Sequence, residues 1–548
     1  KGEYISEESY RNCQAIWRKF ECNSLKDYCL IYLQTDVLLL ADVVQKFRKL
    51  SLEYYELDPL HYFSTPGLAY SAALKSMKHS ISLLSSRSML EMVLDSIRGG
   101  LASVGSLRYF RANNRYCAGY DPSKATSYIM HYDLNNSYAH SLSQKLPFEG
   151  FRWLTREELA SFDVVQVPHN SSRGYLCDVA IDYPISLHQR DNSFPLLIYK
   201  KDIKFSDLSP YSQASLIDQQ SKNIGQRLVA GLENQKSYVL HYKYLQFLIS
   251  RGLKIVKYNR VLTFKQTKLF AKFVAKNTTL RQKSKNEFDT LFFKLVNNSL
   301  FGKTIEKQLD RLNIKLCTSS ARACKLIAQP TFKSARIINK NLSIFNMKRS
   351  SVLLQRPLII GATVLDLSRT LLLHTWSLLQ DYYGDDITLA YTDTDSLSVV
   401  IKTEGDVYDD IKNVFYNIFD TSNYPKTSPI YCTEREKKIG CLKDEAQGQA
   451  IREIIAIRPK TWALKLSNNE NVKKAKGVST KNLKFDHYES VLFENTEVIE
   501  SRVLFHSKDQ KILKLQKVKI ALNPLLVSRY VLAPYGIKTL AYGHYDIP

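Results

Sequence analysis

ITLAYTDTDSLSVVI, residues 387–401, contains the strongest chemical signal in the chain. Two apolar, β-rich segments, 387–392 and 397–401, flank a short polar centre, and this pattern predicts a hairpin. Because side chains alternate across a strand, Asp393 and Asp395 are expected on one face, about 7 Å apart at ~3.3 Å per residue. Carboxylates forced together at an apolar tip repel each other unless a divalent cation neutralises them. A polar turn of the Asx type is the alternative for an isolated Asp-x-Asp pair.

A second acidic strand lies upstream in MHYDLNNSYAHSLSQKLP, residues 130–147. Asp133 ends an apolar strand predicted over 129–134 and is followed by a turn and a helix. Carboxylates from two separated strands can bracket two Mg²⁺ ions, one activating a 3′-hydroxyl and the other holding a triphosphate. Tyr138 is expected to stack beneath a sugar and exclude a 2′-hydroxyl. An ordinary core tyrosine is the alternative.

The third informative segment is FDTLFFKLVNNSLFGKT, residues 288–304. Helical periodicity over 287–300 groups Lys294, Asn298 and Phe301 on one face. Lys294 can meet a triphosphate while Phe301 packs on an incoming base, and Gly302 is expected to end the helix. Taken alone, the segment is better explained as an amphipathic helix with a C-terminal glycine. The opposite face is expected to consist of Phe288, Leu291, Phe292, Leu295 and Ser299.

Together the three segments resemble the family B DNA polymerases, in particular the protein-primed branch found in phages, linear plasmids, adenoviruses and large self-synthesising DNA transposons. Motif A of that branch, D-x-x-S-L-Y-P, is similar to residues 133–139. Motif B, K-x-x-x-N-S-x-Y-G, is similar to residues 294–302, and motif C, Y-x-D-T-D-S, to residues 391–396. Three substitutions depart from the family pattern without removing a metal ligand: Ala139 replaces a proline, and Phe301 and Trp462 replace tyrosines.

The resemblance implies a DNA-directed DNA polymerase that uses two Mg²⁺ ions, with Mn²⁺ as the alternative, on a DNA primer-template and dNTPs. The implied catalytic residues are the three aspartates. Asp133 and Asp395 are implied to bridge the metals, with Asp393 as a weaker or outer carboxylate. The implied dNTP-binding residues are Tyr138, Lys294, Asn298, Phe301 and a further cation among Arg281, Lys283 and Lys285.

Further matches concern the DNA. IRGG, residues 97–100, resembles the Y-x-G-G linker that coordinates the primer, and RPKTW, residues 458–462, resembles the primer-gripping K-x-Y motif. KDE at 443–445, KGV at 476–478 and the closing TLAYGHYDI are similar to the C-terminal part of transposon-encoded members. The implied DNA-binding residues are Arg98, Gly99, Gly100, Tyr391, Thr394, Gly302, Lys460, Trp462 and Lys476.

The N-terminal region resembles part of an exonuclease. YLQTD, residues 32–36, is similar to the third exonuclease motif, with Tyr32 and Asp36 on a helix, but the upstream D-x-E carboxylates are absent. Two residues cannot bind two metals, so we expect no proofreading from this chain, and metal-dependent 3′ trimming would contradict that. The first residue is Lys1 and no targeting segment opens the sequence. We therefore interpret the chain as N-terminally truncated.

Composition agrees with a nucleic-acid enzyme. The 548 residues include 77 Lys+Arg and 53 Asp+Glu, which gives a net charge of +24. Such an excess favours a polyanionic partner, and the length exceeds what one hydrophobic core supports. No apolar run approaches the ~20 residues of a membrane helix, so no membrane partner is expected. Nine scattered cysteines without C-x-x-C indicate a reducing intracellular location, in nucleus or cytoplasm, and no zinc site.

Two stretches concentrate the positive charge. Residues 234–286 contain thirteen Lys/Arg and no acid, and residues 311–365 contain ten Lys/Arg and no acid. Solvated basic faces are the usual meaning of such a bias. In the first stretch aromatic residues alternate with the cations, which favours a groove that holds phosphates and stacks bases.

The expected fold is a right hand of α+β type, with an antiparallel palm sheet that carries the three aspartates and with fingers and thumb. A C-terminal remnant of an RNase H-like exonuclease domain is expected to precede it. By analogy, the two insertions of the protein-primed branch would contact a terminal protein and encircle the template. The expected segments are 1–100 (exonuclease remnant and linker), 101–155 (palm, motif A), 156–258 (insertion and palm), 259–305 (fingers), 306–355 (second insertion), 356–445 (palm, motif C) and 446–548 (primer grip and thumb).

Two alternatives to a DNA-directed DNA polymerase remain. A catalytically silent DNA-binding remnant of a mobile-element polymerase would share the charge pattern, although intact carboxylates argue against it. Synthesis on RNA templates is a further alternative. Residues 383–386, YGDD, resemble the G-D-D of RNA-dependent polymerases, but no matching motifs surround them, and a turn is needed there between a helix and a strand.

Overall fold

The computed structural model describes residues 5–216, 223–508 and 511–548, which form two compact units. The large unit comprises Ser76–Glu306, Leu354–Ile499 and Ile520–Pro548. The small unit comprises Lys1–Lys75, Lys307–Leu353 and Glu500–Lys519. Each unit has its own sheet and its own helices, and each is described separately below.

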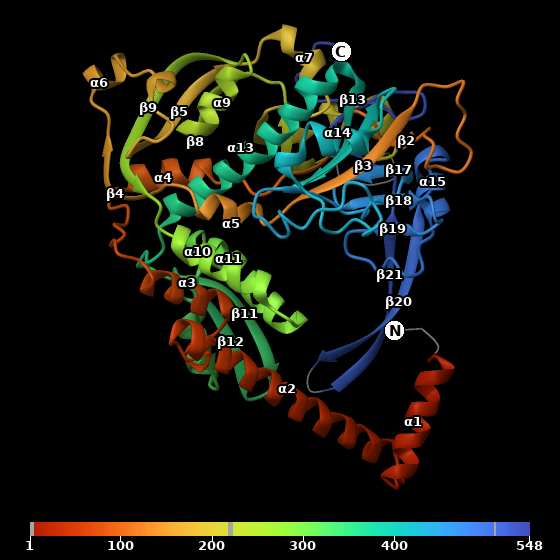
Figure 1. Ribbon diagram of the computed structural model, residues 1–548. Helices are drawn as coiled ribbons and strands as arrows, with labels where there is room; N and C mark the ends of the chain where they lie inside the picture. Colours follow the sequence, from red (N-terminus) through yellow and green to blue (C-terminus); the bar gives the residue numbers. More distant parts are fainter. Residues whose placement is uncertain (1–4, 217–222, 509–510) are drawn as a thin grey trace. The chain divides into compact units, whose positions relative to one another are not determined.

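A ten-stranded, mostly antiparallel sheet forms the centre of the large unit (Figure 1). The predicted hairpin and the predicted acidic strand are confirmed as β13, β14 and β3, within two residues at each end. The main path is β1 (Ala102–Val104), β13 (Ile387–Asp393), β14 (Ser396–Lys402), β3 (Ser127–Leu134), β17 (Ile451–Arg458), β18 (Thr461–Leu466) and β19 (Asn471–Lys474), with β2 (Tyr109–Arg111), β15 (Phe419–Asp420) and β16 (Leu442–Asp444) beside it.

The register of this sheet brings the acidic strand ends together. On β3, Asp133 lies opposite Ser396 of β14 on one side and Lys443 of β16 on the other. On β13, Asp393 lies opposite Ala102 of β1. All three pairings are antiparallel, so the motif A strand and the motif C hairpin present their ends at the same edge.

Helix α13 (Leu358–Tyr383) is the main apolar helix of the large unit. By length and composition it could cross a membrane, but 83% of its most apolar window is buried inside the molecule. The helix packs against α5 (Ser137–Leu142), α9 (Tyr242–Ser250) and the sheet, so its apolar surface is used in the core. The YGDD segment forms the expected turn, a 3₁₀ turn at Gly384–Asp386.

The predicted fingers form a helical pair, α10 (Ala271–Lys283) and α11 (Glu287–Thr304). Between the helices, buried Asn277 donates a 2.9 Å hydrogen bond to the side-chain carbonyl of Asn297. The expectation that Gly302 ends α11 is wrong, because the helix continues to Thr304. The Thr304 hydroxyl donates to the Phe301 carbonyl at 2.7 Å, which satisfies a carbonyl of the last turn and makes a C-terminal glycine unnecessary.

The residues between motifs A and B form a second sheet in the large unit, with strand order β4-β9-β5-β8. Its strands are β4 (Leu146–Trp153), β9 (Lys254–Thr267), β5 (Arg173–Asp182) and β8 (Gln235–His241). A separate hairpin joins β6 (Leu197–Lys204) to β7 (Asn223–Gly231). The remaining elements are α4 (Arg87–Ser96), α6 (Arg156–Ala160), α7 (His188–Asp191), α8 (Pro210–Ala214), α14 (Val407–Asn413), α15 (Phe485–Phe493), β22 (Tyr530–Val531) and β23 (Thr539–Leu540).

The small unit contains long helices and a three-stranded sheet. Helix α2 (Leu25–Tyr55) starts with a capping box in which Ser24 and Asp27 satisfy each other's backbone amides. The sheet has the order β10-β12-β11 and packs on α12 over a small core that includes Phe345. The other bounds are α1 (Glu7–Lys19), α3 (Thr65–Lys75), β10 (Leu312–Cys317), α12 (Ser320–Ile327), β11 (Phe332–Asn339), β12 (Leu342–Lys348) and the paired strands β20 (Val498–Lys508) and β21 (Lys511–Leu522), whose outer parts belong to this unit.

Candidate active site

The three predicted aspartates line one cavity of about 810 Å³ in the large unit. Asp133 comes from the end of β3, and Asp393 and Asp395 come from the tip of the β13–β14 hairpin. The other residues lining this carboxylate pocket are His131, Tyr138, Asn298, Tyr391, Thr394, Ser396, Glu445, Lys460, Trp462, Lys474, Ala475 and Lys476.

The hairpin tip is a tight turn and not a continuous strand. Thr394 has a φ of 68°, and Asp395 lies outside both strands. The Asp395 amide donates to the Asp393 carbonyl at 2.8 Å, and the Asp395 carbonyl accepts from the Leu134 amide at 2.8 Å. Strand alternation is therefore not what brings Asp393 and Asp395 to one pocket. The turn does so, tied to β3.

The linker before β1 supports this turn. The Thr394 amide donates to the Leu101 carbonyl at 2.7 Å. A Cβ atom on Gly100 would lie 2.3 Å from the Thr394 hydroxyl oxygen, whereas one on Gly99 would meet nothing within 4 Å. Close approach of the two backbones therefore requires glycine at position 100 and not at position 99.

Arg369 of α13 holds the linker before β1 through hydrogen bonds to its backbone carbonyls. Its guanidinium donates to the carbonyls of Arg98 at 3.0 Å and Gly99 at 3.4 Å, and it pairs with Asp366 at 2.8 Å. The expectation that Arg98 contacts DNA is wrong in this structure. Its side chain is only 4% exposed, stacks 3.9 Å from the centre of the Tyr238 ring, and donates to the Val239 carbonyl.

The pocket carries more negative charge than its own cations compensate. Burial, followed by the charges of Asp395 and Glu445, raises the pKa of Asp133 to about 8. Burial also raises the pKa of Asp395, against a 3.3 Å hydrogen bond from the Ser137 hydroxyl. The charge of Lys294 on α11 acts in the opposite direction on both carboxyls. A divalent cation would relieve this repulsion.

Lys460 forms an ion pair with Asp393. Its ammonium lies 2.9 and 3.0 Å from the two carboxylate oxygens, and its amide donates to the Tyr391 hydroxyl at 2.9 Å. Among the described residues, no three carboxylate, imidazole or thiol groups are arranged as a ready-made metal site. The pocket contains carboxylate oxygens that could bind a metal, but the Asp393 carboxylate is paired with Lys460. Metal binding through Asp393 would therefore require this side chain to rearrange.

Tyr138 and Phe301, which we expect at the sugar and the base of a dNTP, contact each other. Tyr138 lines the pocket, but its ring stacks on Phe301, with centroids 4.2 Å apart and planes 12° apart. Phe301 is 9% exposed and faces inward, so the ring face covered by Tyr138 cannot receive a base. On α11 the expected apolar face is also wrong at Leu291 and Leu295, which are exposed, because the helix packs through Phe293 and Val296 in place of them.

Only some of the remaining residues predicted to bind the dNTP line the carboxylate pocket. Asn298 lines the carboxylate pocket, but Arg281, Lys283 and Lys285 do not. Arg281 is partly buried near Asp420, and burial lowers its pKa. The other two cations are exposed at the end of the α10 helix and just beyond it.

Of the predicted DNA contacts, the structure places Tyr391, Thr394, Lys460, Trp462 and Lys476 in the carboxylate pocket. In contrast, Gly302 does not line the pocket, and a Cβ there would meet nothing within 4 Å.

Sequence reasoning missed three further pocket residues. Glu445 is brought in because β16 pairs with β3, a long-range register with no local signal beyond the KDE match. His131 precedes Asp133 by two positions on β3, and burial lowers its pKa to about 4. Lys474 comes from β19.

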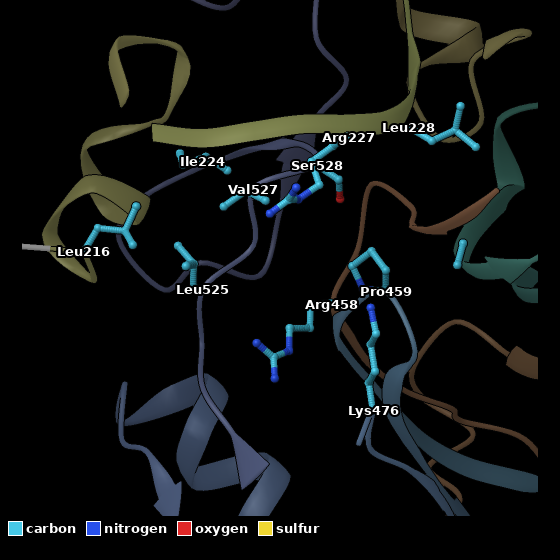
Figure 2. Close-up of a pocket in the computed structure, with 11 residues that line it drawn as sticks. Leu216, Ile224, Arg227, Leu228, Arg458, Pro459, Lys476, Leu525, Val527 and Ser528 are labelled. Carbon is cyan, nitrogen blue, oxygen red and sulfur yellow. The ribbon is translucent and has the colours of Figure 1, made fainter. Parts of the chain in front are cut away.

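A second cavity of about 490 Å³ adjoins the carboxylate pocket and shares Lys476 with it. Figure 2 shows Arg227, Arg458 and Lys476 around this cavity together with aliphatic side chains. The Arg458 guanidinium donates to Asn523 at 2.7 Å. The apolar wall consists of Leu216, Ile224, Leu228, Leu525 and Val527.

The predicted exonuclease residues lie in the small unit, on the surface of α2. Tyr32 is 61% exposed, and Asp36, one helical turn later, is also exposed. Within the described part of the chain no cluster of potential metal ligands includes either residue. The nine cysteines, all within the described residues, are free thiols.

Comparison with known proteins identifies the family. A family model described as DNA polymerase type B, organellar and viral, matches residues 3–310, more than half of the chain. No curated protein matches. The ternary complex of phi29 DNA polymerase with primer-template DNA and incoming nucleotide is similar at a TM-score of 0.51 and 14% identity, over 84% of this chain and 68% of that one.

A second solved structure is less similar. The family B DNA polymerase of the hyperthermophilic archaeon Pyrobaculum calidifontis has a TM-score of 0.29 and 10% identity, over 84% of this chain and 40% of that one, which is too low to support an argument. The family match and the phi29 similarity agree with the motifs and with the antiparallel sheet that carries them. The chain therefore belongs to the organellar and viral type B DNA polymerases, which are DNA-directed DNA polymerases, and it has their right-hand fold.

Proposed function

We propose that this chain extends a primer 3′-hydroxyl with deoxynucleotides on a DNA template, using two divalent metal ions. The observation that carries the proposal is the convergence of Asp133, Asp393 and Asp395 on one pocket, where burial and, after it, the charges of Asp395 and Glu445 raise the pKa of Asp133 to about 8. Such a cluster gains free energy from a cation that supplies the missing countercharge. Mg²⁺ is the proposed ion and Mn²⁺ the alternative.

The donor set suits these ions, because Mg²⁺ and Mn²⁺ prefer oxygen ligands and the pocket offers several carboxylates. Asp133 and Asp395 would hold the metals, with Asp393 and Glu445 as additional carboxylates. Bound ions would supply Lewis-acid activation of the hydroxyl and neutralisation of the triphosphate. Asp133 stands on β3, Asp393 ends β13 and Asp395 lies in the β13–β14 turn, so the carboxylates that would hold the ions come from separate segments at one sheet edge.

The proposed reaction is an in-line displacement. The primer 3′-hydroxyl loses its proton, its oxygen bonds to the α-phosphorus of the dNTP, and the bond to the β-phosphate oxygen breaks to release pyrophosphate. Lys294, whose charge already acts on Asp133 and Asp395, would stabilise negative charge on the triphosphate. Tyr138, held in place by its stack on Phe301, would restrict the sugar and disfavour a 2′-hydroxyl.

The adjoining basic cavity is the proposed path of the primer. Arg227, Arg458 and Lys476 offer charges to phosphates, and the aliphatic wall can contact sugars. Lys476 belongs to both cavities, so a strand that passes there would lead directly to the carboxylates.

A terminal-protein hydroxyl is proposed as a second primer, on the basis of the resemblance to the protein-primed branch. The expected result is transfer of a labelled dNMP to a protein on an unprimed template. Labelling of DNA primers alone would contradict this part of the proposal.

Primer extension tests the proposed function. The purified chain, incubated with Mg²⁺, dNTPs and a primed single-stranded template, should extend the primer in template order, and EDTA should stop the reaction. A chain that binds the primed template without extending it would support the rival interpretation, a catalytically silent DNA-binding remnant. Equal activity on an RNA template would contradict the assignment of DNA as the template.

A further inference from the structure

A cavity of about 460 Å³ lies on a different part of the large unit and shares no lining residue with the carboxylate pocket. Its volume falls within the roughly 300–1,000 Å³ of small-ligand sites. It is a groove between two helices, because its lining residues follow helical spacing on each. From α9 come Lys243, Gln246, Phe247 and Ser250, and from α13 come Leu367, Thr370, Leu371 and His374.

The α9–α13 groove has an apolar floor and a basic rim. Phe247 and Leu367 are buried, and the Phe247 ring lies 6.3 Å from the exposed ring of His374. His140, at the end of α5, and His169 complete the rim together with Lys243. None of the residues that line the groove is acidic.

Lys243 lacks a counterion. It is partly buried, and within the described part of the chain its ammonium has no hydrogen-bond or ion-pair partner. Burial, followed by the charges of Lys145 and Lys268, lowers the pKa of Lys243. Lys145 is engaged elsewhere, since it donates to backbone carbonyls of the 170–171 loop. The groove therefore has one ammonium group in its lining and no carboxylate to pair with it.

His140 also has unused hydrogen-bonding capacity. Its Nδ1 is buried without a partner among the described residues, and burial lowers its pKa. Gly440 packs on another edge of the ring, where an added Cβ would lie 2.8 Å from Cδ2. The imidazole is thus held by packing, with Nδ1 shielded from solvent and unpaired.

We propose that the α9–α13 groove is a second binding site, for a nucleotide phosphate. Lys243 would bind the phosphate, and the floor of Phe247 and Leu367 would receive the base or sugar. The bound phosphate could belong to a free nucleotide or to one nucleotide of a single-stranded DNA, because both present the same chemical groups. A divalent metal is not the proposed ligand, because among the described residues no three histidine, cysteine or acidic side chains of the groove are grouped so that they could hold a metal ion.

Lysine footprinting tests this site on the unmodified protein. Acetylation of Lys243 is followed by mass spectrometry in EDTA, so that metal-dependent binding at the carboxylates does not contribute. The probes are dAMP, the oligonucleotide (dT)₁₀ and inorganic phosphate, and exposed Lys257 of β9 is the internal reference. We expect one of the two nucleotide probes to slow Lys243 acetylation about fivefold near 80% occupancy, with Lys257 unaffected by dAMP.

Each outcome of the footprinting decides the proposal. Protection by dAMP identifies a free nucleotide as the ligand, and protection by (dT)₁₀ alone identifies a DNA strand. Protection by inorganic phosphate equal to that by dAMP would overturn the nucleotide assignment and leave a simple anion site. No protection by any probe would overturn the site itself.

A variant series checks that Lys243 makes the contact. Lys243→Met should weaken binding of the protecting probe by about tenfold or more, the loss expected for one charge-assisted hydrogen bond. Lys243→Arg should retain binding, and Lys257→Met should match the parent chain, with circular dichroism confirming that all variants fold. Equal affinities of Lys243→Met and Lys257→Met would contradict the proposal.

Discussion

At the scale of single residues, the carboxylate pocket is defined by charges that are only partly balanced. Asp133, Asp395 and Glu445 repel one another, Lys294 reduces that repulsion from α11, and Lys460 pairs directly with Asp393. The pocket therefore already contains one cation at the hairpin tip. A metal that uses Asp393 has to displace an ammonium group first.

Replacing Lys460 by Met should strengthen metal binding in the absence of DNA. A partly exposed ion pair contributes up to about 1 kcal/mol, so loss of the competing ammonium should tighten Mn²⁺ binding about two- to fivefold. Electron paramagnetic resonance titration of free Mn²⁺ measures this. Lys474→Met is the matched control, because Lys474 lines the same pocket without contacting Asp393. An equal increase in both variants, or none in Lys460→Met, would contradict the displacement.

The raised pKa of Asp133 gives the metal-free enzyme a defined pH dependence. The folded carboxyl keeps its proton up to about pH 8, whereas the unfolded one loses it near pH 3.8. Between these values the native state binds the extra proton, so stability falls as the pH rises through this range. Metal binding requires the carboxylate, so Mg²⁺ should raise the melting temperature more at about pH 9 than at about pH 6.

Differential scanning fluorimetry with and without Mg²⁺ measures this difference. The side chain of the Asp133→Asn variant cannot ionise, so Mg²⁺ should raise its melting temperature by the same small amount at both pH values. A parent chain that is stabilised equally by Mg²⁺ at both pH values would show that Asp133 is already ionised near pH 6.

At the scale of elements, the site depends on the contact between the linker at residues 97–101 and the β13–β14 turn. Arg369 of α13 binds the carbonyls of the linker, and the linker binds the Thr394 amide. One helix, one linker and one hairpin thus determine where Asp393 and Asp395 lie. Gly100 is the position at which this arrangement is tightest.

Gly100→Ala should therefore destabilise the protein, whereas Gly99→Ala should not. The new methyl group would lie 2.3 Å from the Thr394 hydroxyl oxygen, an overpacking that typically costs about 1–3 kcal/mol. At position 99 an added Cβ meets nothing. Thermal unfolding of both variants measures the difference, and equal melting temperatures would show that the turn adapts to the methyl group.

The hairpin and the acidic strand could be predicted from sequence because strand periodicity and turn residues are local signals. Other features depend on contacts between distant segments. Glu445 enters the pocket only through the pairing of β16 with β3. The buried face of α11 is set by its neighbours, so Leu291 is exposed although periodicity groups it with Phe292, which is buried. The sequence motif predicts Arg98 as a DNA contact, but its side chain is buried against Tyr238 and Val239 of β8.

At the scale of the whole molecule, part of the net charge of +24 can be located on particular elements. The acid-free stretch 234–286 lies in the large unit, where it provides Lys243 to the α9–α13 groove and Arg281 to the helical pair. Most of the second stretch, 311–365, lies in the small unit and forms the β10-β12-β11 sheet with α12. Its cations remain on the surface, as expected for a protein that meets a polyanion.

The family and the right-hand fold are established by agreement between motifs, sheet and comparison. Polymerase chemistry is the activity proposed for the carboxylate pocket. It depends most directly on Asp395 of motif C, whose backbone carbonyl accepts from the Leu134 amide and whose carboxylate accepts from the Ser137 hydroxyl.

The most direct test is single-nucleotide incorporation by the parent chain and by Asp395→Ala on the same primed template with Mg²⁺. Anisotropy of the labelled template measures DNA binding in parallel. Incorporation by the variant should fall by about three orders of magnitude or more, comparable to removal of a principal electrostatic catalytic group, while DNA affinity should change little. Incorporation at the parent rate by Asp395→Ala would contradict the assignment of this pocket as the polymerase active site.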